Sequence, residues 1–178
     1  MTPRTSLRWR LRDATAEAHA RLDACVGAAF AHPDGYAAFL RGMQCFVGTA
    51  AQALDDQGLR RDAATLSADL ADLDSVPLPV QRVAAVDAVR ATGWRYVLAG
   101  SSLGARVLLP RASRLGFDAG FGARYLALQA GSPAWRAFLE SLDADTPHTA
   151  ADGAIDGARA AFACAQDAMA AAFDAVPA

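Results

Sequence analysis

The sequence contains no lysine: its 17 basic residues are all arginines and stand against 19 acidic residues, for a formal net charge of -2. A chain with this balance lacks the basic surface on which nucleic-acid binding depends. We attribute the missing lysine to compositional bias of the genome, with placement of some arginines for bidentate carboxylate contacts as the alternative. Nucleic acid is therefore not an expected partner.

Cysteines are few, and long apolar runs are missing. Cys25, Cys45 and Cys164 are odd in number, far apart and free of C-x-x-C spacing, so we expect small buried thiols rather than disulfides or a zinc site. No run of about 18 apolar residues suggests a membrane span. The arginine-rich segment from Met1 to Asp13 lacks the apolar core of an export signal. We therefore expect a cytoplasmic protein with no membrane partner.

β-Branched residues are also sparse, whereas alanine, leucine and arginine are abundant, and this composition favours helix nearly everywhere. Prolines and glycines interrupt the helical pattern at 31–35, at Gly58, at 77–79 and at 116–122. The breaks leave seven expected helices, approximately at residues 5–25, 36–55, 60–73, 80–91, 94–113, 133–142 and 151–173. Without a long linker or repeat, we predict an all-α, single-domain irregular helical bundle over residues 1–178.

One face of the first expected helix carries Arg12, Thr15, His19 and Asp23 at spacings of three and four residues. Arg12 and His19 are about 10.5 Å apart along the helix axis, a reach that suits a metal-bound macrocycle and its carboxylate tail. Asp23 would accept a hydrogen bond from the second ring nitrogen of His19 and fix its tautomer. The spacing alone favours the alternative, an ordinary surface histidine with charged neighbours.

A second pattern lies in residues 93–106, where Gly100 and Gly104 stand four residues apart on one helix face. Each glycine inside a helix costs about 1 kcal/mol relative to alanine, so a pair on one face requires a reason. From spacing alone, close packing of two helices is the favoured explanation. Close approach of the helix backbone to a flat ligand is the alternative.

The two patterns together resemble the haem oxygenases, and specifically the short bacterial, biliverdin-producing branch that is associated with bacterial phytochromes or with iron acquisition. Residues 11–23, LRDATAEAHARLD, resemble the proximal-helix signature of this family. Residues 96–104, YVLAGSSLG, resemble the distal-helix signature, and the two signatures follow each other in the order that the family has. The resemblance covers nearly the whole chain and implies a haem oxygenase fold with haem between a proximal and a distal helix.

By position, the resemblance assigns His19 as the axial ligand of the haem iron and Arg12 as a contact of a haem propionate. It aligns Arg136 with another basic residue on the propionate side. Phe162 and Met169, seven residues apart in the last expected helix, resemble apolar positions of the haem wall. Ordinary core packing explains these two equally well.

The catalytic positions that the resemblance implies on the distal side are Gly100, Ser101 and Gly104. Ser101 stands where the animal enzymes have an aspartate, as small polar residues do in the bacterial branch. Ala99 stands where the family usually has a glutamate. Both differences concern the distal hydrogen-bond network, and through it turnover and regiochemistry, rather than haem binding.

The implied reaction uses haem as cofactor and substrate and cleaves it with O₂ and external electrons to biliverdin, carbon monoxide and ferrous iron. The electrons would come from a separate reductase or ferredoxin, because the sequence lacks a Gly-x-Gly-x-x-Gly fingerprint, and a bacteriophytochrome is a further expected partner for biliverdin. Ala99 and Ser101 motivate the alternative of a haem carrier or sensor without turnover. A carboxylate-bridged metal centre would need Glu-x-x-His pairs, which are missing.

Overall fold

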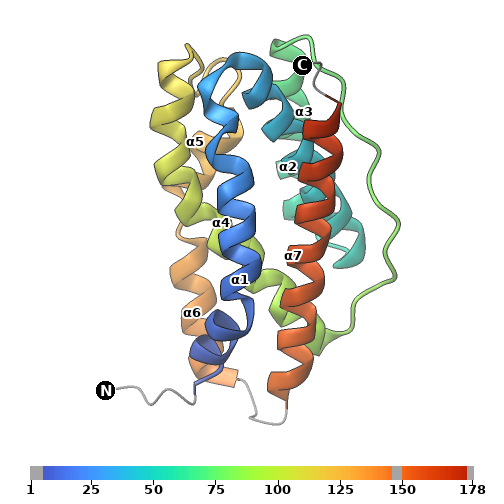
Figure 1. Ribbon diagram of the computed structural model, residues 1–178. Coiled ribbons are helices and arrows are strands. Elements are labelled where there is room, and N and C mark those ends of the chain that lie inside the picture. Colours follow the sequence, from blue (N-terminus) through green and yellow to red (C-terminus); the bar gives the residue numbers. More distant parts are fainter. Residues whose placement is uncertain (1–5, 146–149, 176–178) are drawn as a thin grey trace.

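The computed structural model describes residues 6–145 and 150–175, except for the side chains of 143–145. This part of the chain forms seven α-helices and one 3-10 helix and contains no strand, so the predicted all-α class is confirmed (Figure 1). The elements are α1 (Leu7–Gly27), η1 (Ala29–Ala31), α2 (Pro33–Ala53), α3 (Gln57–Asp72), α4 (Ala88–Arg114), α5 (Arg124–Gly131), α6 (Ala134–Asp145) and α7 (Ala151–Asp174).

The predicted helix at residues 80–91 is wrong, because residues 75–87 form an extended strap that leads into α4. Prolines at 77 and 79 cannot donate backbone hydrogen bonds and hold the residues before them in extended conformations. Hydrogen bonds to α2 replace the helical ones: the Gln81 N–H donates to Thr49 Oγ1 at 3.0 Å, and the Val86 N–H donates to the carbonyl of Ala53 at 3.0 Å. The predicted helix at 94–113 therefore begins earlier, at Ala88, with no break before Trp94.

Two further boundaries differ from the prediction. Gly58 does not end the second helix: α2 ends at Ala53, and Gly58 lies in the first turn of α3. The side chain of Asp56 caps α3 by accepting the N–H of Gly58 at 2.8 Å and the N–H of Leu59 at 3.2 Å. The short helix α5 was not predicted, because eight residues give too little periodicity to be recognised.

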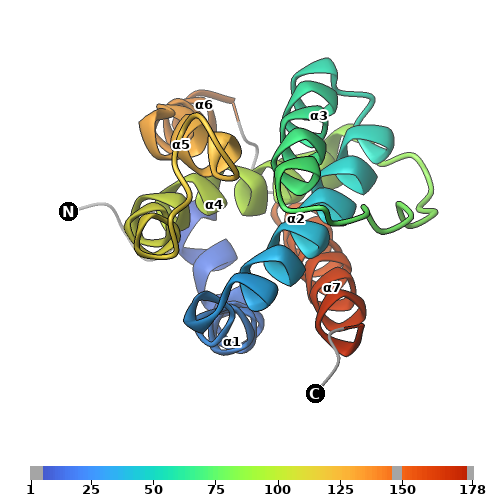
Figure 2. The same cartoon turned by 90° about the horizontal axis from the view of Figure 1, so that it is seen from above.

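The helices form two groups when the bundle is viewed from above, with α4, α5 and α6 on one side and α2, α3 and α7 on the other (Figure 2). Helix α7 packs against α1, α2 and α4 and thereby joins the groups. Its sequence suits this position, since alanines form most of its buried surface and allow neighbouring helices to approach. None of the described helices is both long and apolar enough to cross a membrane.

Helices α4 and α7 cross at Gly93 and Gly157, a pair that we call the glycine crossing. A Cβ atom on Gly93 would overlap the backbone of α7 at Ala154 and Ala158. A Cβ atom on Gly157 would overlap the backbone of α4 at Arg90. Only glycine on both helices permits contact this close, so this crossing fixes how α4 enters the bundle.

The expectation of three buried thiols holds for two of the cysteines. Cys45 and Cys164 are buried between α2 and α7, and burial raises the pKa of both thiols, that of Cys164 to about 12. Cys25 is exposed near the end of α1, so its prediction was wrong. The last turns of α1 have solvent on most of their surface, and the helical pattern alone does not reveal this.

Candidate functional site

His19 projects from α1 with 64% of its side chain exposed. Its Nδ1 atom lies 2.9 Å from Oδ2 of Asp23, one helical turn further along, as the spacing of the two residues predicts. This contact selects the tautomer in which Nδ1 carries the proton and donates to the carboxylate. The Nε2 atom is then the nitrogen with a lone pair available to a metal ion.

Helix α7 holds the part of α1 that carries His19. The ring of Phe162 meets the imidazole of His19 edge to face, with 5.9 Å between the ring centroids. The side-chain amide of Gln166 donates to the carbonyl of Ala18 at 3.0 Å. Met169 packs instead on Gly42 of α2, within the core. Of the two apolar wall positions, Phe162 therefore borders the candidate ligand, and Met169 belongs to helix packing.

The predicted preference for helix packing at Gly100 and Gly104 is wrong. A Cβ atom on Gly104 would meet no heavy atom of the described residues within 4 Å, and one on Gly100 would have Trp135 as its nearest neighbour, at 3.8 Å. The glycine of α4 that does serve close packing is Gly93, with Gly157 as its partner on α7. Gly100 and Gly104 instead leave the backbone of α4 open on one side, which was the alternative explanation.

The open side of α4 continues as an apolar strip. Leu103 and Val107 are 39% and 59% exposed, unusually high values for large aliphatic side chains on a helix that is otherwise packed. Together with the two glycines they occupy positions i, i+3, i+4 and i+7 of one helix face. We call Gly100, Leu103, Gly104 and Val107 the open stripe. An uncovered apolar face of this kind is typical of a ligand-binding surface.

Helix α1 faces the open stripe because the two helices meet one turn earlier. The hydroxyl of Thr15 on α1 donates to the carbonyl of Leu11 at 2.8 Å and is near enough to Tyr96 on α4 to oppose the rise in the pKa of that phenol. His19 and Gly100 each follow this contact by four residues, and both helices run upward in Figure 1. His19 and Gly100 therefore lie at a similar level along the two helices, although they are far apart in the sequence.

Positive charge gathers where α1 and α4 meet. Burial raises the pKa of Tyr96, while the Thr15 hydroxyl and the guanidinium groups of Arg12 and Arg8 oppose the increase, which places both arginines near the phenol. The Arg12 guanidinium also lies over the ring of Trp9, 5.2 Å from its centroid. Arg12 is thus held against Trp9 on α1, in the neighbourhood of Tyr96 on α4.

An aromatic cluster on α6 closes the same end of the site. The ring of Trp135 lies 5.7 Å from that of Tyr96, and the ring of Phe138 lies 6.2 Å from it, between centroids. Arg136 is exposed and joins this region only through its neighbour Trp135. The sequence reasoning missed Tyr96 and Trp135, although Tyr96 stands one helical turn before Gly100, and this spacing would have indicated it.

Ser101 lies next to Gly100 and donates a hydrogen bond from its hydroxyl to the carbonyl of Leu98, at 2.7 Å. It is partly buried, and Tyr125 on α5 is near enough for Ser101 to oppose the rise in the pKa of its phenol. Tyr125 was also missed, because its helix was not predicted. The predicted catalytic positions Gly100, Ser101 and Gly104 thus lie together in the middle of α4.

No protein-family model matches the chain, but comparisons by sequence and by structure find relatives. The haem oxygenase PigA of Pseudomonas aeruginosa is 35% identical over 170 residues, which cover 83% of this chain and 85% of that protein. The chain belongs to the haem oxygenase family. The structure of a haem oxygenase from Neisseria meningitidis, determined with NO and CO bound, superposes with a TM-score of 0.77 and 28% sequence identity over 96% of this chain and 94% of that one.

For a haem oxygenase, the described residues provide what a haem requires. The Nε2 atom of His19 could serve as a nitrogen ligand, and the open stripe could face a flat apolar ring with no side chains at its two glycines. Arg12 could supply a cation for a propionate at the edge of such a ring. No group of three His, Cys, Asp or Glu among the described residues is placed to hold a metal ion, so a carboxylate-bridged metal centre finds no support there.

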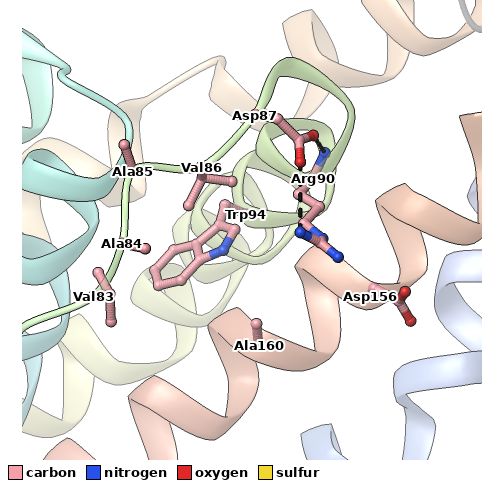
Figure 3. Close-up of a pocket in the computed structure, with 9 residues that line it drawn as sticks. All are labelled: Val83, Ala84, Ala85, Val86, Asp87, Arg90, Trp94, Asp156 and Ala160. Atoms are coloured by element: carbon pink, nitrogen blue, oxygen red, sulfur yellow. Dashed lines mark hydrogen bonds and ion pairs between the residues drawn. The ribbon is translucent and has the colours of Figure 1, made fainter.

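A cavity of about 440 Å³ elsewhere in the haem oxygenase fold is separate from this site (Figure 3). Its walls are the strap, the start of α4 and the middle of α7. Trp94 and Val83 form an apolar part of the wall, and Arg90, Asp87 and Asp156 give it charge. None of the predicted site residues lines this cavity.

Proposed function

We propose that the chain binds haem between α1 and α4 and degrades it to biliverdin, carbon monoxide and ferrous iron, using O₂ and external electrons. The observation that carries this proposal is the position of His19, with Nδ1 fixed by Asp23, opposite the open stripe of α4. Family membership supplies the reaction, and this geometry supplies a place where it could occur. When bound, the haem iron provides the site at which O₂ is activated.

In this reaction the protein would orient the haem and shield it from water. His19 would hold the iron from one side through Nε2, and Phe162 limits the rotation of its ring. On the other side, Gly100 and Gly104 would let the ring lie directly against the backbone of α4, while Leu103 and Val107 exclude water from its edge. A close surface without water on this side would restrict how a ligand bound between the two helices is oriented.

The charged end of the site would determine the orientation of the ring. Arg12, with Tyr96 beside it, is the proposed partner of one propionate, and Arg136 on α6 is a candidate for the other. Because a guanidinium binds a carboxylate with two parallel hydrogen bonds, Arg12 would fix an angle as well as a position. The angle decides which edge of the ring faces the oxygen, and therefore which biliverdin isomer is formed.

Partners follow from the same reaction. We propose a separate reductase or ferredoxin as the electron donor, and a bacteriophytochrome as one acceptor of the biliverdin. Action in the cytoplasm is consistent with three free cysteines, one of which is exposed. The alternative of a haem carrier or sensor without turnover remains the second candidate, because Ser101 and Ala99 differ from the residues that the family commonly uses on the distal side.

The test is to add haemin to the purified protein, record the Soret band, and then supply O₂ with ascorbate or a ferredoxin system. We expect the Soret band to decay while biliverdin absorption appears. His19→Ala should shift the Soret band and remove most turnover without changing the helical circular dichroism, because the exposed imidazole contributes little to packing.

A matched control is His32→Ala, since His32 is exposed at the start of α2, away from α4. This variant should keep the spectrum and turnover of the wild type. A wild-type Soret band that persists without biliverdin would favour the carrier or sensor. A His19→Ala variant with the wild-type haem spectrum would show that another group binds the iron.

A further inference from the structure

Helix α1, which carries His19, is held in the bundle mainly by α7. Within the described residues, α1 packs along α7, has smaller contacts with η1 and α6, and makes no extended contact with α2 or α4 (Figure 1). Only Leu11 and Thr15 of α1 are buried. The direction in which α1 presents His19 therefore depends on what fixes this helix to α7.

Among the described residues, two side-chain hydrogen bonds join α1 to α7. Near the start of α1, the guanidinium of Arg10 donates to Asp152 Oδ1 at 2.7 Å. Asp152 is 90% exposed, so solvent screens this pair and it stabilises little. The second bond runs from the side-chain amide of Gln166, which is partly buried, to the carbonyl of Ala18 at 3.0 Å. The partly buried bond is thus the one that meets the backbone directly before His19.

The Ala18 carbonyl lies inside a helix, where each carbonyl accepts the N–H of the residue four positions later. Because a carbonyl oxygen has two lone pairs, the Gln166 amide is able to use the second one without breaking the helix. A directional bond to the backbone resists rotation of α1 about its own axis, which purely apolar contacts allow. Phe162, one turn before Gln166 on α7, meets the ring of His19 edge to face. Helix α7 thus contacts both the ring of His19 and the backbone beside it.

We propose that Gln166 is a positioning residue for His19, whose bond to the Ala18 carbonyl sets the direction in which Nε2 points. This inference rests on the proposed function, because the direction matters only when Nε2 binds the haem iron. Asp23 fixes which nitrogen of the imidazole carries the proton, but it belongs to α1 and turns with it. Phe162 contacts the ring and not the backbone. Gln166 supplies the restraint on the backbone from outside α1.

A purely structural hydrogen bond is the alternative, and Gln81 on the strap makes a matched comparison. The side-chain amide of Gln81 also donates to a carbonyl inside a helix, that of Cys164 on α7, at 3.2 Å, and Gln81 is partly buried as well. The two glutamines thus make the same kind of bond, but only Gln166 makes it to the helix that carries His19. Loss of either bond should lower the Tm by about 3 °C, the contribution of one hydrogen bond in a chain of this size.

The contact is tested first without haem. Gln166→Met keeps the length of the side chain and removes the amide. In apoprotein labelled with ¹³C at the backbone carbonyls, this variant should move the Ala18 resonance to a lower chemical shift, because a carbonyl without the bond is less polarised. Gln81→Met should instead move the Cys164 resonance and leave that of Ala18 in place. An Ala18 resonance that does not move in Gln166→Met would overturn the contact and with it the positioning role.

The positioning role is tested in the haem-loaded protein. Resonance Raman spectroscopy of the ferrous form records the iron–histidine stretching band, which His19→Ala identifies by removing it. Gln166→Met should lower the frequency of this band, broaden it and release haem about threefold faster, less than loss of a direct partner of the imidazole would cause. Gln81→Met should keep the wild-type band and release rate despite its lower Tm.

Two outcomes separate this inference from the proposed function. A wild type that shows no iron–histidine band would overturn the proposed binding of haem at His19. A wild-type band and release rate that Gln166→Met leaves unchanged would overturn the positioning role of Gln166 alone.

Discussion

Two parts of α4 use glycine for opposite purposes. At the glycine crossing, Gly93 lies directly on the backbone of α7, and the missing side chain is replaced by a neighbouring helix. Two turns further along, a Cβ atom on Gly100 would only touch Trp135 at 3.8 Å, and one turn later the missing side chain of Gly104 leaves space that the described residues do not fill. The comparison shows that the sequence of a helix does not tell why it contains a glycine. Only the surroundings of the glycine show whether another helix packs against its backbone or the backbone stays open to a ligand.

The two parts depend on each other. The glycine crossing anchors the start of α4 against α7, which also holds α1 through Phe162 and Gln166. Helix α7 therefore helps to set the separation between α1 and α4, and its Phe162 borders His19. A site built in this way keeps its shape when the ligand is absent, because the contacts that define it belong to the core.

The largest effect is expected at the glycine crossing. Gly93→Ala should lower the free energy of unfolding by about 3 kcal/mol, since the added methyl group overlaps backbone atoms that cannot move aside. For a chain of this size, this corresponds to a fall of roughly 10 °C in Tm, measured by circular dichroism. The matched change in the same helix, Gly104→Ala, should raise the stability of the apoprotein by about 1 kcal/mol. Tm shifts of the same sign in Gly93→Ala and Gly104→Ala would contradict the distinction between the glycine crossing and the open stripe.

Filling the open stripe should affect the ligand and not the fold. Gly104→Leu places a side chain in the space that haem would occupy, so we expect haem affinity to fall about tenfold or more, equivalent to about 1.4 kcal/mol. The Tm of the apoprotein should not fall, because no described atom lies near this position. Titration with haemin, followed at the Soret band, measures the affinity. An unchanged affinity would place the haem away from Gly104.

Changing the apolar character of the open stripe should have a smaller effect. Val107→Ser removes methyl groups that are exposed in the apoprotein and would be covered by haem, so affinity should fall about threefold, a fraction of the value of a fully buried valine. Val76→Ser on the strap is the control, because Val76 is still more exposed and lies outside α4. Equal effects of the two changes on the haemin titration would argue that Val107 remains exposed in the complex.

The smallest effects on affinity are expected at the charged end, where the biliverdin isomer is the more sensitive readout. Arg12→Ala should weaken haem binding about twofold, because an ion pair at an exposed edge is largely screened by solvent, and should change the isomer ratio. Arg136→Ala should do less, because only Trp135 connects it with the site. Arg21→Ala is the control, since Arg21 pairs with Glu17 on α1. The isomers are separated by chromatography. An isomer ratio in Arg12→Ala equal to that in Arg21→Ala would contradict the assignment of Arg12 to a propionate.

Most of the helical content could be predicted from the sequence, because helix propensity and apolar periodicity act over neighbouring residues. The strap at 75–87 could not, since its stability comes from hydrogen bonds to Thr49 and Ala53 of α2, which lies much earlier in the chain. Alanine and valine in this segment are compatible with helix, and the contacts with α2 outweigh that preference. Helix α5 was missed for a similar reason, because buried Asp69 of α3 accepts its first two N–H groups.

The candidate site was likewise predictable where it depends on neighbouring residues of one helix, and not where it depends on contacts between helices. The contact between His19 and Asp23 follows from helical spacing and was predicted correctly. The preference for helix packing at Gly100 and Gly104, which came from their spacing alone, was wrong. The sequence of α4 does not specify what lies beside each of its faces. The roles of Arg12, Arg136 and Ser101 in binding and turnover stay predictions that the variants above examine.

The sequence by itself determined the helices and the faces that carry His19 and the distal glycines, because side chains three or four residues apart are neighbours on any α-helix. Only the tertiary structure decided how the two helices are held relative to each other, since α7 packs against both α1 and α4. It also brought Trp135 to Tyr96 and Phe162 to His19. Such contacts join residues of different helices, and no local pattern of amino acids encodes them.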